Sequence, residues 1–101
     1  MRNKLRRYVY YVQHFRFEDA IPYLQEAYRF YPQDYTIQFE LAVSFIVTRQ
    51  HDKAFEFVKN LSRLDKKLFL HDYGVLRSQW VQYEDIFADF ERYMVQKVSK
   101  F

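Results

Sequence analysis

Two stretches of this chain, FEDAIPYLQEAYRFYP (residues 17–32) and HDKAFEFVKNLSRLDK (residues 51–66), share one pattern. Ala20 and Ala54 hold the same place in both stretches, and the interval between them is called the repeat period below. A period of roughly 34 residues is typical of stacked supersecondary units, each too small to bury its apolar face alone. The spacing therefore predicts a small solenoid that acts as a binding scaffold.

Length and composition fit one helical domain that covers residues 1–101. The chain has ten Tyr and eleven Phe but only one Gly and two Pro, so few residues interrupt its periodic stretches. It has no Cys, which excludes disulfides and thiolate metal sites and leaves a cytoplasmic location as the default expectation. No stretch approaches the roughly twenty apolar residues that a membrane-spanning helix needs.

Hydrophobic periodicity predicts an all-α fold with six helices. Apolar residues recur three and four positions apart in each of them, and Pro32 ends the second, because proline disfavours helical geometry in the residue before it. The predicted helices span approximately residues 3–14, 18–31, 34–48, 52–64, 67–79 and 84–100.

The same pattern resembles the tetratricopeptide repeat family, whose signature is an aromatic, Leu, Gly and Tyr in one helix, then Ala, an aromatic, Ala and a closing Pro in the next. Lys4, Arg7 and Tyr8 depart from it in the first helix, and the register of the third unit is shifted by two positions. The residues that carry the resemblance are Phe17, Ala20, Leu24, Ala27 and Pro32; Leu41, Ala42, Phe45, Ala54 and Val58; and Gly74, Tyr83, Ile86, Phe90 and Tyr93. The resemblance implies an α-α superhelix of three hairpins, approximately residues 1–34, 35–66 and 67–101.

The resemblance also implies that the first helix of each unit lines a concave groove. Such a groove would be apolar and would suit an amphipathic or hydrophobic helical peptide rather than a terminal carboxylate, because Leu5 and Val9 stand where carboxylate-binding members have polar residues. Burial of the same stripe by superhelical closure or by a second copy is the alternative. The predicted groove residues are Leu5, Val9, Val12, Phe39, Val43, Ile46, Val47, Leu68, His71 and Val75.

The last predicted helix is apolar around much of its circumference, whereas solenoids usually end in polar caps. This favours self-association into a homo-oligomer through Phe87, Met94 and Phe101, or contact with another partner. A chain that is a piece of a longer array is the alternative.

The sequence offers no pattern typical of an enzyme, a cofactor site or a metal site. Its three histidines, His14, His51 and His71, are far apart in sequence, and neither an HExxH motif nor a glycine-rich phosphate loop occurs. RNA binding is the rival hypothesis, since helical-hairpin repeats of similar length bind single-stranded RNA. Val9, Val43 and Val75 offer no polar group to a base, so a protein partner is favoured and nucleic acid is disfavoured.

Overall fold

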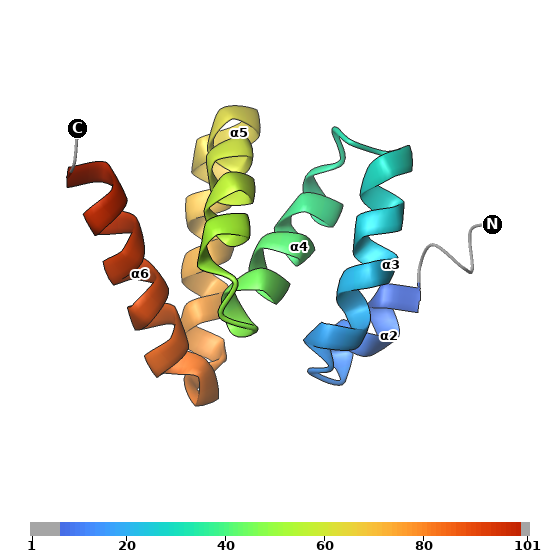
Figure 1. Cartoon of the computed structure of the whole chain (residues 1–101), viewed down its shortest axis with the longest axis horizontal. Helices are drawn as coiled ribbons and strands as arrows, with labels where there is room; N and C mark the ends of the chain where they lie inside the picture. Colours follow the sequence, from blue (N-terminus) through green and yellow to red (C-terminus); the bar gives the residue numbers. More distant parts are fainter. Residues whose placement is uncertain (1–6, 100–101) are drawn as a thin grey trace.

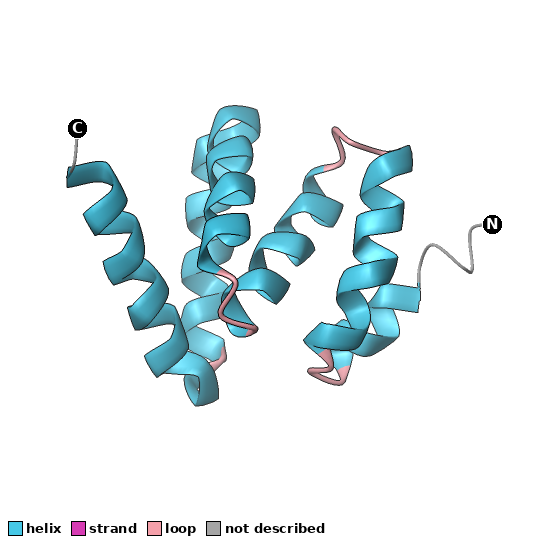
Figure 2. Ribbon diagram, viewed as in Figure 1, coloured by secondary structure: helices cyan, strands magenta, loops and turns pink. Residues whose placement is uncertain are grey.

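The computed structural model describes the backbone of residues 7–99 and the side chains of residues 9–98. Within that range the chain is helical and has no strand, so the all-α prediction is confirmed (Figure 2). The elements are α2 (Arg7–Gln13), α3 (Phe17–Phe30), α4 (Tyr35–Val47), α5 (His51–Gln79), the 3₁₀ turn η1 (Val81–Tyr83) and α6 (Glu84–Ser99).

Helix α5 consists of two legs, the first leg being residues 51–64 and the second leg residues 66–79. Asp65 between them has an extended backbone (φ −161°, ψ 91°), which reverses the chain. The Asp65 side chain accepts a hydrogen bond from the backbone N–H of Leu68 at 3.0 Å and so caps the second leg. In Figure 1 the second leg runs behind the first, and the predicted break between residues 64 and 67 is confirmed by the non-helical backbone of Asp65.

The turns after α2 and after α4 have the same backbone geometry. Phe15 (φ 58°) and Arg49 (φ 63°) both take the left-handed conformation, and they lie one repeat period apart. Each turn closes with the two hydrogen bonds of a Schellman motif. In the first, the N–H groups of Phe15 and Arg16 donate to the carbonyls of Val12 (3.0 Å) and Tyr11 (2.7 Å); in the second, those of Arg49 and Gln50 donate to Ile46 (3.0 Å) and Phe45 (2.8 Å).

The core follows the same period. Ala20 and Ala54 are both fully buried, and their small side chains let neighbouring helices approach closely. Three leucines (Leu24, Leu41 and Leu61) have no exposed surface, and burial of each contributes about 1.5–3 kcal/mol to stability. Tyr28 of α3 meets Phe57 of the first leg edge to face at 5.1 Å, which joins the two matching helices.

Successive helices pack on one another along the chain, α2 on α3, α3 on α4 and α4 on α5. Helix α6 then packs on α5 and α4 through the fully buried Phe87 and Phe90. The result is a row of helices, 43 × 28 × 22 Å, with α2 and α6 at opposite sides (Figure 1). Among residues 7–99, none of the helices has the length and apolar character that crossing a bilayer requires.

Candidate functional site

The predicted groove residues fall into three groups. Val43 (2% exposed) and Ile46 (1% exposed) are buried, so their prediction as ligand contacts is wrong. They are covered because α4 lies in the middle of the row and has neighbours on more than one side (Figure 1). Leu5 lies outside the described residues.

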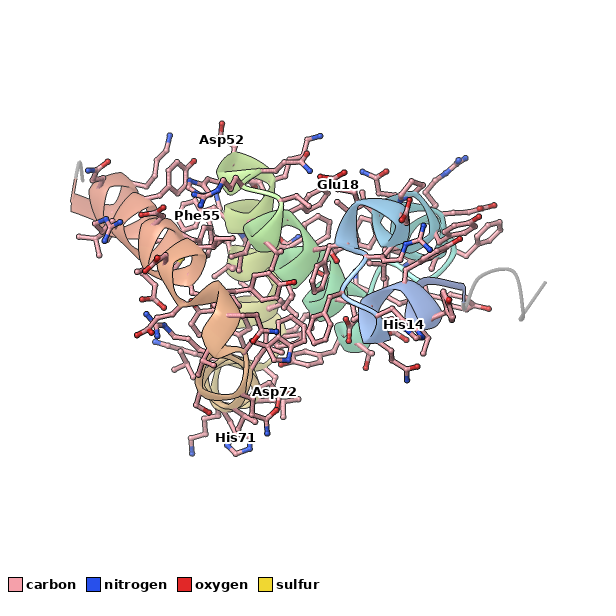
Figure 3. All side chains as sticks on the ribbon, turned by 90° about the horizontal axis from the view of Figure 1, so that it is seen from below. His14, Glu18, Asp52, Phe55, His71 and Asp72 are labelled. Atoms are coloured by element: carbon pink, nitrogen blue, oxygen red, sulfur yellow. The ribbon has the colours of Figure 1, made fainter. Side chains whose placement is uncertain are left out.

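The remaining predicted residues keep accessible surface and define what is called the inner face below. Val9, Leu68 and Val75 are exposed, at 36%, 41% and 40%. His71 is exposed as well and projects away from the body of the molecule (Figure 3). Three further residues of the inner face are half-buried, namely Val12, Phe39 and Val47.

A tyrosine that the sequence did not single out fixes α4 against the second leg. The hydroxyl of Tyr35 donates to Asp72 Oδ2 at 3.0 Å, and the Tyr35 ring stacks on Phe39 at 6.0 Å. Phe39 in turn meets Phe69 at 6.2 Å. Burial, together with the hydrogen bond to Asp72, raises the pKa of Tyr35. These contacts set the distance between the α4 and second-leg parts of the inner face.

The predicted self-association face is wrong for Phe87. This residue is fully buried and lies edge to face against Tyr73 of the second leg at 5.9 Å. Met94 is half-buried and packs against the core, and Phe101 lies outside the described residues. The exposed apolar residues of α6 are instead Val95 (66%) and Val98 (64%). Val95 borders a hollow of about 430 Å³ that Ala88, Glu91, Arg92 and Gln96 also line.

A charged network anchors α6 to the second leg. Arg77 donates to both carboxylate oxygens of Glu91, at 2.6 and 3.1 Å, and the Tyr73 hydroxyl donates to the same carboxylate at 2.6 Å. Burial opposes ionisation of Glu91, but the bonds from Arg77 and Tyr73 outweigh it and lower the pKa of Glu91. The outer surface of α6 is therefore held in a fixed orientation.

Two hollows occupy equivalent places in the two matching turns, and sequence reasoning missed both. The first-turn hollow has a volume of about 280 Å³ and is lined by Phe15, Arg16, Phe17, Glu18, Asp19, Val47, Thr48 and Tyr83. The second-turn hollow has a volume of about 350 Å³ and is lined by Arg49, Gln50, His51, Asp52, Lys53 and Tyr93. Residues 15–19 and 49–53 are one repeat period apart, so one backbone scaffold presents two different sets of side chains.

Helix α4 also carries polar groups in an apolar setting. Burial raises the pKa of Glu40 to about 7. One turn further on, the hydroxyl oxygen of Ser44 is buried and has no hydrogen-bond partner among the described residues. Among the described residues, no three His, Asp or Glu side chains come close enough together to hold a metal ion.

No protein-family model, curated protein or solved structure matches this chain. Its relation to the tetratricopeptide repeat family is therefore a proposal that rests on this chain's own residues and geometry.

Proposed function

We propose that the chain is a tetratricopeptide-like superhelix and a protein-interaction scaffold, which binds an apolar or amphipathic helical segment on its inner face. The observation that carries this proposal is the turn that recurs after one repeat period, with its left-handed residue at Phe15 and again at Arg49. A backbone that repeats at the period of the sequence pattern supports stacked hairpins.

The chemistry of the inner face supports an apolar partner. Val9, Leu68 and Val75 each expose a third or more of their surface, and removing such apolar surface from water lowers the free energy. A helix that places apolar residues three and four positions apart would cover them in the helix-in-groove mode. His71 is the one polar member of the inner face, so base recognition in RNA has little to contact there.

Selection from a displayed library of random peptides tests the inner face. The protein should enrich peptides with apolar residues three, four and seven positions apart, and a Leu68→Glu/Val75→Glu variant should lose them. Val81→Glu is the matched control, since Val81 is 69% exposed on η1 and lies outside the inner face. Two outcomes would count against the proposal: no enrichment, or enrichment of peptides that bind the wild type, the double variant and the Val81→Glu control equally well.

Self-association is a second candidate function, and the outer side of α6 favours it. Val95 and Val98 lie less than one helical turn apart on this helix and are both well exposed, at 66% and 64%. Light scattering after gel filtration, across a wide concentration range, measures the mass. We expect an oligomer that Val95→Glu/Val98→Glu converts to a monomer while Val81→Glu leaves it intact. A wild-type monomer at every concentration would exclude this function.

A further inference from the structure

We propose that the first-turn hollow binds the ammonium group of a lysine side chain from a protein partner, and binds it more tightly when the lysine is methylated. This hollow lies at the turn between α2 and α3, and Val47 is the single residue that it shares with the inner face. It rests on three features of the hollow, namely its rings, its free carboxylate and its contrast with the second-turn hollow.

Aromatic rings from two separate segments, residues 15–17 and 80–83, form one wall. The ring centroids of Phe15, Phe17 and Tyr83 are 5.9 to 6.2 Å apart, and Trp80 backs all three at 5.4 to 6.0 Å. At these separations the rings touch each other, so a ligand rests on their outer side rather than between them. Phe15 is 45% exposed and offers that outer surface. Aromatic faces of this kind attract alkylammonium groups.

The charges in the hollow favour a cation. Asp19 forms an ion pair with Arg16 at 2.7 Å, and the Arg16 guanidinium also lies 5.1 Å from the centre of the Tyr11 ring. The Arg16 guanidinium is therefore already in contact with Asp19 and Tyr11. The Glu18 carboxylate is exposed and makes no ion pair within the described part of the chain. The hollow thus combines aromatic surface with one exposed carboxylate in the first turn of α3 that has no ion-pair partner among the described residues.

The second-turn hollow has the same backbone turn but different side chains. The preference of the first-turn hollow for a cation therefore comes from its side chains and not from the turn. Arg49 and Lys53 bring two positive charges to the equivalent positions, and the only carboxylate there, Asp52, already accepts a hydrogen bond from Tyr93. Asp89 pairs with Arg49 at 3.0 Å, but Lys53 makes no ion pair in the described part of the chain, so that place is less favourable to a cation. Asp52 and Glu18 lie on the same side of the molecule (Figure 3), so the turn edge presents a basic and an acidic hollow along one row.

Size agrees with a single side-chain head group. The volume of about 280 Å³ lies just below the range of about 300–1,000 Å³ that is usual for sites of drug-sized molecules. A methylated ammonium group is weakly hydrated and loses less on leaving water than an unmodified one, which gives the expected order of affinity.

Fluorescence of Trp80, the only tryptophan of the chain, measures binding directly. The ligands are three blocked tripeptides, Gly-trimethyllysine-Gly, Gly-lysine-Gly and the analogue in which a neutral carbon replaces the trimethylated nitrogen. We expect saturable changes in the order trimethyllysine, lysine, neutral analogue, with about tenfold between the first and the last. Equal responses to the charged and the neutral peptide, or none that saturates, would overturn the proposal.

Variants assign the binding to this hollow. Glu18→Gln should weaken trimethyllysine binding several-fold, whereas Asp52→Asn, at the equivalent position of the second-turn hollow, should not change it. Circular dichroism checks that both variants fold. The N-methyl proton resonance should also shift upfield, because ring currents act above the faces of Phe15 and Tyr83. Unchanged affinity in Glu18→Gln or an unshifted resonance would show that the contact is elsewhere.

Discussion

Arg49 adopts the left-handed backbone conformation that Phe15 adopts one repeat period earlier, with φ of 63° and 58°. Both residues carry a Cβ atom, which the left-handed region disfavours, and both are held there by Schellman hydrogen bonds. The strain recurs with the repeat, which indicates that it belongs to the way each hairpin reverses.

Glycine at position 49 should therefore be more stable than alanine. Arg49→Gly and Arg49→Ala both remove the 3.0 Å ion pair with Asp89, so their difference isolates the backbone. We expect urea denaturation to give a free energy of unfolding that is about 1 kcal/mol higher for the glycine variant than for the alanine variant. At Glu56, inside the first leg, the order should reverse, with alanine more stable by about 1 kcal/mol. Alanine above glycine at position 49 would contradict the left-handed assignment.

Stability should fall as pH rises through the range set by Glu40. Burial raises the pKa of Glu40 from 4.5 to about 7, so the folded protein holds this proton in a range where the unfolded chain has lost it. Between pH 4.5 and 7 the free energy of unfolding should drop by about 1–3 kcal/mol. Glu40→Gln should remove most of that drop and be the more stable protein at pH 8 in thermal melts. An identical pH profile for the variant would show that Glu40 is solvated.

The anchor of α6 should have the opposite pH dependence. The pKa of Glu91 is lowered in the folded state, so its contribution to stability is present above its unfolded pKa and is lost as pH falls through the folded one. Glu91→Gln should be less stable than the wild type at pH 7, and the two should converge under acidic conditions. Denaturant midpoints at several pH values measure this. A difference that stays constant down to low pH would exclude an ionic origin.

Phe87 should behave as a core residue. Its ring is fully buried against Tyr73, so Phe87→Ala should cost about 3–5 kcal/mol and Phe87→Glu should abolish folding. Val81→Glu, a control on η1 at 69% exposure, should leave the melting temperature nearly unchanged. Calorimetry of the three variants decides whether Phe87 is a core residue or part of a self-association surface. A folded Phe87→Glu protein would restore Phe87 as a surface residue.

The sequence predicted the positions of the helices better than it predicted which side of each helix is exposed. Periodicity and Pro32 located the elements, including the break between residues 64 and 67, because these features act on the local backbone. Periodicity reports that a helix is apolar, but not which neighbour covers it. Val43 of α4 and Phe87 of α6 were therefore assigned to surfaces, although neighbouring helices bury both of them.

The first-turn hollow lay beyond sequence reasoning for a different reason. Tyr83 is far from Phe17 along the chain, and no local pattern indicates that their rings meet. The left-handed turn at Phe15 is equally hidden, since glycine, the usual mark of such a position, is absent there. By contrast, the repeat period was evident from Ala20 and Ala54 in the sequence alone. The left-handed turns at Phe15 and Arg49 recur at the same period.

Methyl NMR of the protein with a selected helical peptide tests the inner face most directly. Leucine and valine methyl groups report on Val9, Val47, Leu68 and Val75 on the inner face and on Val95 and Val98 on α6. The account predicts that the peptide shifts the inner-face methyl resonances and leaves those of Val95 and Val98 in place. Shifts confined to Val95 and Val98 would contradict it and would place the binding site on the outer side of α6.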